Sequence, residues 1–171
     1  MSENVETAKK NETGHDTSNL LAMDENYFQV IGFRLGDEEF AVDIFAVKEI
    51  IRMPIMTRVP NAPKFVVGVV NMRGRVIPII DLRIRFGLPE AEMAHSEKKI
   101  VVVEHENKTV GFLVDAVNEV ISINRAITEP PPPMVSGIKS DYITAIAKLD
   151  NKLLILLEIA KILVLAEEYF N

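Results

Sequence analysis

A long segment in the middle of the chain recurs near its C-terminus in chemical character rather than in identity. Residues 65–88 and 142–165 align without a gap, and each is predicted to form a strand, a tight turn, an apolar strand and a short amphipathic helix. Asp81 and Glu158 stand where these helices begin, and a carboxylate there can accept the exposed backbone N–H groups. Only the final leucine of each copy is identical. Gly74 and Asn151 fall at the turn, where a positive φ is expected and where these residue types tolerate it best. Features that both copies share therefore indicate architecture, and features of one copy alone are candidates for function.

The segments that precede the two copies also match, though more loosely. In each half a hairpin signal, at Gly36 and at Asn107, is followed by apolar residues in which Asp43 aligns with Asp115. The chain is therefore predicted to consist of two related units joined by a polar stretch.

The ordered body is expected at residues 26–168, with unit one at about 27–90, unit two at about 98–168, and a disordered tail at residues 1–25. Each unit holds about five short strands separated by turn signals, a spacing typical of small barrels. Helical pattern is clear only at 81–86 and 158–170. Each half alone is short for a stable core, so the halves should share one. The fold class is therefore mainly β: two five-stranded barrels around a shared hydrophobic core, with a few short helices and a C-terminal helix.

Composition excludes several classes of function. The chain has no cysteine, which rules out disulfides and thiolate chemistry, and no apolar run approaches the ~18–20 residues of a membrane span. His15, His95 and His105 lack metal-ligand spacing, and no phosphate-binding glycine loop is present. We therefore expect no enzyme activity, no cofactor, no metal and no direct membrane insertion.

Charge is distributed unevenly along the chain. The net charge is −6, yet residues 50–88 carry +6, so the remainder carries −12. A basic segment on an acidic body indicates a docking face for an acidic partner, although scattered solvated arginines would give the same count. Nucleic acid is not expected as a partner, because the acidic remainder would repel phosphates. A barrel that binds oligonucleotides would also need exposed aromatic residues, and this segment has only Phe65 and Phe86, both at expected core positions.

The two copies differ most at the turn and in the helix that follows. Arg73 in the first turn corresponds to Asp150 in the second, so folding does not require arginine there. The planar guanidinium suits paired recognition of carboxylates or carbonyls on a partner. Arg83 corresponds to Ala160, which makes the first helix the more basic one.

Two further differences concern the strands. Gly68 corresponds to Ala145, so a small residue is expected in both copies for close packing. Pro78 corresponds to Ile155, and a proline inside a strand predicts an unpaired sheet edge. With Val47 nearby, such an edge could receive a strand or apolar patch of another protein.

The residues at this turn carry a resemblance to a known family. The stretch Gly-Val-Val-Asn-Met-Arg-Gly-Arg-Val-Ile-Pro-Ile-Ile-Asp-Leu, which begins at residue 68, resembles the signature of CheW-type chemotaxis coupling proteins. Residues 35–50, 110–117 and 153–168 also resemble that family, and the similarity extends over about residues 27–168.

The resemblance implies a fold of two SH3-like five-stranded barrels and a non-enzymatic adaptor. Such proteins couple transmembrane chemoreceptors to the histidine kinase CheA in bacterial chemotaxis signal transduction. The implied partners are the regulatory domain of CheA and the cytoplasmic tip of the receptors, and the implied location is cytoplasmic, at membrane receptor arrays.

Carried over position by position, the resemblance implies partner binding by Val47, Glu49, Gly68 and Arg73. Further candidates are Ile50, Asn71, Arg75 and Arg83. Which partner each residue serves stays open. An adaptor for another kinase pathway, such as surface motility, would use the same motifs. A coupling protein with an added phosphoreceiver domain is less expected, because the chain ends at residue 171.

Overall fold

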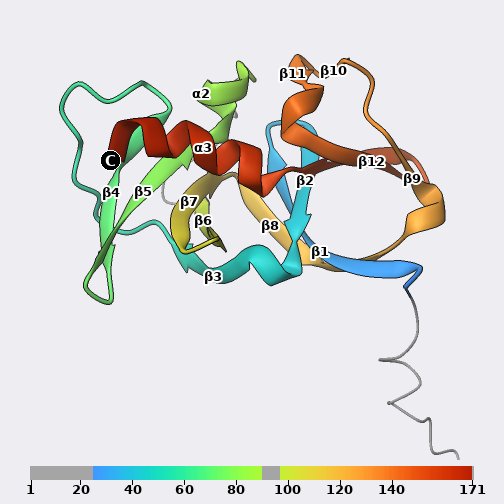
Figure 1. Ribbon diagram of the computed structural model, residues 1–171, viewed down its shortest axis with the longest axis horizontal. Helices are drawn as coiled ribbons and strands as arrows, with labels where there is room; N and C mark the ends of the chain where they lie inside the picture. Colours follow the sequence, from blue (N-terminus) through green and yellow to red (C-terminus); the bar gives the residue numbers. More distant parts are fainter. Residues whose placement is uncertain (1–24, 90–96, 171) are drawn as a thin grey trace, which may run out of the picture.

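The computed structural model describes residues 25–89 and 97–170 (Figure 1), so almost all of the predicted N-terminal tail lies outside it. The strands are β1 (Tyr27–Leu35), β2 (Glu38–Asp43), β3 (Val47–Arg52), β4 (Val66–Met72), β5 (Arg75–Asp81), β6 (Lys99–His105), β7 (Lys108–Val114), β8 (Ala116–Asn124), β9 (Thr128–Glu129), β10 (Met134–Val135), β11 (Ile138–Lys139), β12 (Ile143–Leu149) and β13 (Lys152–Leu157). The helices are α2 (Leu82–Phe86) and α3 (Ile159–Phe170), with 3₁₀ turns η1 (Ile44–Ala46), η3 (Arg125–Ile127) and η4 (Ser140–Tyr142). The predicted strands, hairpins and both helices are confirmed.

The strands form two principal sheets. One has the order β3-β6-β7-β5-β4 and is called barrel one here; the other has the order β8-β1-β2-β13-β12-β9 and is called barrel two. The strands β10 and β11 pair separately. The chain is therefore mainly β and has the two SH3-like barrels that were expected, although barrel two carries the two-residue strand β9 in addition to the five strands expected.

The barrels do not coincide with the halves of the sequence, which corrects the predicted barrel boundaries of 27–90 and 98–168. Barrel one contains the hairpin β6–β7 from the second half, and barrel two contains the hairpin β1–β2 from the first half. Each inserted hairpin is held by a parallel contact, β5 with β7 and β13 with β2. Each half thus contributes its first hairpin to the barrel of the other half.

The repeat itself is confirmed by strand register. In the hairpin β4–β5, Val66 pairs with Ile80, and in β12–β13 Ile143 pairs with Leu157, a shift of 77 positions. Both hairpins have a register irregularity at the next pair. The N–H of Asp81 also donates to a carbonyl before β4 (2.7 Å), as does the N–H of Glu158 to the carbonyl before β12 (2.9 Å).

The two inserted hairpins are also equivalent, but their residue numbers differ by another constant offset. Leu35 pairs with Glu38 in β1–β2, and His105 pairs with Lys108 in β6–β7, a shift of 70 positions. At this offset Asp115 corresponds to Phe45, which corrects the predicted alignment of Asp43 with Asp115.

The two long hairpins turn differently. Arg73 (φ 51) and Gly74 (φ 80) are both left-handed, as a two-residue type I′ turn requires. In the second copy the positive φ belongs to Asp150 (φ 20), so the prediction for Asn151 was wrong.

One hydrophobic cluster joins the two barrels, as expected. Fully buried members include Phe33 and Phe40 from barrel two, Phe112 from barrel one, and Ile162 from α3. Smaller clusters fill the interior of each barrel. The helix α3 begins after β13 and extends across the molecule toward the strands of barrel one (Figure 1).

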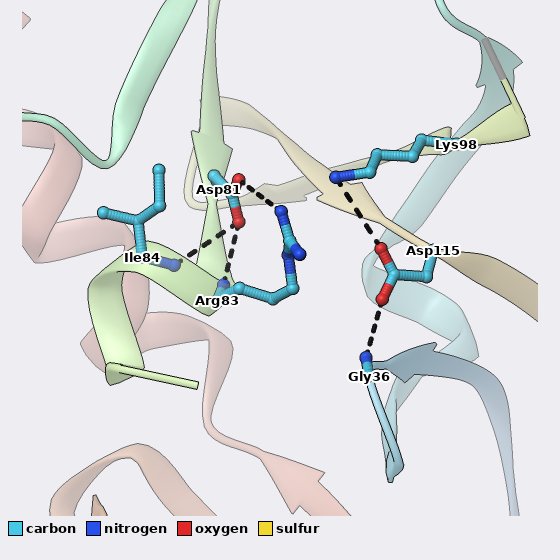
Figure 2. Close-up of polar contacts among 6 residues, drawn as sticks. All are labelled: Gly36, Asp81, Arg83, Ile84, Lys98 and Asp115. Atoms are coloured by element: carbon cyan, nitrogen blue, oxygen red, sulfur yellow. Dashed lines mark hydrogen bonds and ion pairs between the residues drawn. The ribbon is translucent and has the colours of Figure 1, made fainter. Parts of the chain in front are cut away.

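Buried charges reinforce this junction (Figure 2). Asp115, 3% exposed, accepts a 2.6 Å hydrogen bond from the N–H of Gly36 and lies 3.9 Å from Nζ of Lys98. The N–H of Asp115 donates to the carbonyl of Arg34 (2.9 Å). Asp115 follows β7 of barrel one, and Gly36 lies in the turn of the β1–β2 hairpin of barrel two. These contacts therefore fix one barrel against the other.

Asp81 forms the second buried pair. Its Oδ1 accepts hydrogen bonds from the N–H groups of Arg83 (2.9 Å) and Ile84 (3.4 Å), which caps α2 as its position predicted. Its Oδ2 lies 3.5 Å from Nη2 of Arg83 (Figure 2).

Pro78 does not mark a sheet edge, which corrects the prediction. The strand β5 lies inside barrel one, and Pro78 pairs with Val69 on β4. The parallel contact with β7 begins only at Ile79, so the missing N–H of proline falls before that contact. The end strands of this sheet are β3 and β4.

Within the described residues, no helix is long and apolar enough to cross a membrane. In the same part of the chain, no cluster of His, Asp and Glu side chains could hold a metal ion.

Candidate functional site

Two of the predicted binding residues meet on the surface of barrel one. Nη2 of Arg73, in the β4–β5 turn, lies 3.5 Å from Oε2 of Glu49, on β3. The Arg73 side chain is 84% exposed and that of Glu49 is 36% exposed. The type I′ turn places the arginine at the tip of its hairpin, where a partner can reach it. A pair this exposed adds little to stability, because water screens it.

Glu104, on β6, organises the neighbouring cations. Its carboxylate accepts a 3.0 Å hydrogen bond from the hydroxyl of Thr109 and lies 3.7 Å from Lys48 and 3.6 Å from Arg75. The Thr109 hydrogen bond is the main cause of the lowered pKa of Glu104; burial, the next largest effect, raises this pKa, and the charges of Lys48 and Arg75 lower it. Arg75 also donates to the carbonyl of Asn107 (3.4 Å). Sequence reasoning missed Glu104, since nothing local shows that β6 lies beside β3.

Replacing Thr109 with valine should raise the pKa of Glu104 toward its usual value, because the carboxylate loses its hydroxyl donor. A ¹³C NMR titration of the Glu104 carboxyl carbon would measure the change. Because the pKa of Glu104 is lowered in the folded state, its ionisation stabilises the fold at pH values above its unfolded-state pKa. This stabilisation is lost as the pH falls through the folded-state pKa, and Thr109→Val should have less of it. The control is Thr144→Val, because the hydroxyl of Thr144 donates to Glu158 instead of Glu104. An unchanged Glu104 titration in Thr109→Val would contradict this assignment.

Apolar side chains accompany the ion pair on β3. Val47 begins the strand and is partly buried against the shared core. Ile50 is exposed, as are Ile55 and Val76 elsewhere in the first half. Barrel one therefore offers both apolar and charged groups to a partner.

Gly68 lies inside rather than on the surface. A Cβ built on it would lie 2.9 Å from the carbonyl oxygen of Thr57 and 3.1 Å from Cβ of Met56. Thr57 and Val69 exchange two backbone hydrogen bonds, of 2.9 and 2.8 Å. Gly68 thus allows the segment before β4 to pack against barrel one, and the structure places it away from direct surface contact.

The remaining candidates divide into exposed and buried positions. Asn71 is exposed, and its Oδ1 accepts a 3.2 Å hydrogen bond from the N–H of Gly74, which stabilises the turn that carries Arg73. Arg75 is exposed beside Glu104. Arg83 is only 6% exposed and paired with Asp81, so the expectation that it binds a partner is corrected.

Arg85 is also engaged within the molecule. Its guanidinium lies over the rings of Tyr142 (5.2 Å) and Phe65 (5.8 Å) and donates to the Tyr142 hydroxyl (2.9 Å). The basic segment is therefore less of a docking face than its charge predicts. Ion pairs are described for Arg73, Arg75 and Arg83. Of these three arginines, Arg73 at the hairpin tip has the most exposed side chain.

Comparison with known proteins agrees with this architecture. The CheW-like domain family matches residues 29–167. The chain is 37% identical over 139 residues to chemotaxis protein CheW of Helicobacter pylori, covering 81% of this chain and 83% of that one. It is 32% identical over 145 residues to chemotaxis protein CheW of Treponema pallidum, covering 83% and 85%. The solved structure of the scaffolding protein TtCheW from Thermoanaerobacter tengcongensis has a TM-score of 0.72 and 37% identity, covering 77% of this chain and 84% of that one. With matches that span both barrels, the chain belongs to the CheW-like family.

Proposed function

We propose that this protein is a non-catalytic adaptor that couples transmembrane chemoreceptors to the histidine kinase CheA at the cytoplasmic side of receptor arrays. Its relatives are chemotaxis and scaffolding proteins by name. The observation that carries the proposal is the exposed pair of Arg73 and Glu49 at the hairpin tip of barrel one. The equivalent tip of barrel two carries Asp150, so the display of arginine belongs to one copy alone.

Physically, the chain acts by holding two proteins in one geometry. The exposed pair and the apolar residues Val47 and Ile50 supply one docking face on barrel one, and barrel two supplies a second. Receptor state then changes kinase activity only by favouring one kinase arrangement over another.

The direct test is co-purification with a receptor cytoplasmic fragment and the kinase, followed by a phosphorylation assay with and without this chain. We expect a three-component complex whose kinase activity differs from that of the kinase alone. Failure to retain either partner would refute the proposal. Retention of only a kinase from another pathway, such as surface motility, would support the alternative adaptor role.

Replacing Arg73 with aspartate, the residue of the second copy, should leave folding intact and weaken partner binding by about 1–3 kcal/mol, the range for lost charged hydrogen bonds. Isothermal titration with each partner measures the loss. The control Asp150→Arg makes the opposite change at the equivalent turn of barrel two and should leave binding at this face unchanged. Equal affinities for wild type and Arg73→Asp would show that Arg73 is a bystander.

A further inference from the structure

A cavity of about 490 Å³ opens at the mouth of barrel two. Residues that line it include Phe28, Val30, Ala41, Asp43, Leu156 and Glu158. Phe45 stands beside it with 91% of its surface exposed. Barrel mouths of this size are common ligand sites, and this one combines apolar walls with acidic groups at its rim.

The internal repeat shows which residues occupy the equivalent place in barrel one. At the offset of 77 positions, Glu158 corresponds to Asp81 and Ala160, which also lines the cavity, corresponds to Arg83. At the offset of 70, Phe28 corresponds to Lys98 and Phe45 to Asp115. The cavity is thus the counterpart of the buried charge cluster in Figure 2.

In barrel one this place is filled by side chains whose charges balance. Two acids, Asp81 and Asp115, face two cations, Arg83 and Lys98 (Figure 2). In the counterpart the acid is retained as Glu158, but alanine replaces the arginine and two phenylalanines replace the lysine–aspartate pair. The cavity is therefore bordered by Glu158, which lacks the counterpart of Arg83, and by two aromatic rings, one of which is covered by Arg125.

The other charges near the cavity are already engaged. Glu104 is held by Lys48 and Arg75, and Arg125 lies over the Phe28 ring (4.9 Å) while donating to the carbonyl of Glu25 (2.8 Å). By contrast, neither Glu158 nor Asp43 forms an ion pair within the described residues. The carboxylate of Glu158 accepts a 3.2 Å hydrogen bond from the hydroxyl of Thr144, and that of Asp43 caps η1.

We propose that this cavity binds an arginine side chain presented by a partner protein. The guanidinium pairs with Glu158 as that of Arg83 pairs with Asp81, and its planar face packs against the exposed ring of Phe45, since Arg125 already covers Phe28. The chain supplies this cation itself in barrel one and leaves its place to a partner in barrel two. The inference is independent of which receptor or kinase the protein couples.

The test is an NMR titration of the full chain with N-acetyl-arginine methylamide, a blocked arginine that mimics a residue within a protein. We expect shifts at Phe28, Phe45 and Glu158, and at least about tenfold weaker binding of the neutral citrulline analogue. Free arginine, whose carboxylate would meet Asp43 and Glu158, should bind more weakly than the blocked form. Absence of shifts, or equal binding of citrulline, would overturn the cation site; tighter binding of free arginine would overturn the partner-protein source.

Variants of the chain distinguish binding in this cavity from a general effect of added positive charge. Ala160→Arg places an arginine at the position equivalent to Arg83 in barrel one, so it should fill the cavity and weaken binding of the probe at least about tenfold. Val164→Arg places the same charge on an exposed position of α3 outside the cavity lining and should weaken it far less. Phe45→Ala alters an exposed side chain, so the fold should persist while binding weakens. Equal binding by Ala160→Arg and Val164→Arg would contradict the proposal.

Discussion

Replacing Asp115 with alanine is expected to lower the free energy of unfolding by about 3–5 kcal/mol, the range for breaking a buried ion pair. The substitution leaves Lys98 buried without its counter-charge and removes the acceptor of the Gly36 N–H. Because Asp115 joins barrel one to the hairpin inserted in barrel two, the loss should affect both barrels in one transition. Urea unfolding followed by circular dichroism measures it.

Two further variants make this prediction specific. Asp43→Ala removes an exposed acid that caps η1, so it should cost about 1 kcal/mol. The double variant Lys98→Met with Asp115→Leu removes both charges together, so it should recover much of the stability lost in Asp115→Ala. If Asp115→Ala costs no more than Asp43→Ala, the buried pair is not what holds the barrels together.

Replacing Gly68 with valine is expected to destabilise the protein by about 3 kcal/mol, at the upper end of the range for overpacking. The new side chain would meet the backbone of Thr57, which is fixed by two hydrogen bonds to Val69 and cannot move aside without breaking them. Partner binding should fall with the displaced segment, although Gly68 itself is buried.

The second copy offers the matched control. Ala145, the counterpart of Gly68, lines the cavity of barrel two, so Ala145→Val can direct its added atoms into open volume. Its cost should stay below about 1.5 kcal/mol. Chemical denaturation of both variants, with binding normalised to the folded fraction, makes the comparison. Similar costs at the two positions would contradict the role assigned to Thr57.

Local signals in the sequence were sufficient for the elements themselves. Alternating apolar residues and turn residues placed β1, the hairpins and α2, and Asp81 was correctly predicted to cap its helix. The exchange of hairpins could not be predicted in this way, because the local sequence pattern of a hairpin does not depend on which barrel it joins. The parallel contacts that decide the matter, β5 with β7 and β13 with β2, leave no local pattern.

The candidate site was predicted in part for a related reason. Arg73 and Glu49 were singled out separately, and only the fold shows that they meet. Arg83 was misread because a count of charges treats every arginine as solvated, whereas Asp81 makes its burial possible. Whether the singled-out residues contact a receptor or the kinase stays a prediction.

The hairpin exchange has a consequence for how the molecule could have acquired an asymmetric surface. Each half completes its barrel with the hairpin of the other half, which is the arrangement expected of a domain-swapped homodimer of one half. The present protein corresponds to such a homodimer joined end to end. Once joined, the two subunits no longer had to share every residue, so one loop could carry arginine while its twin carried aspartate.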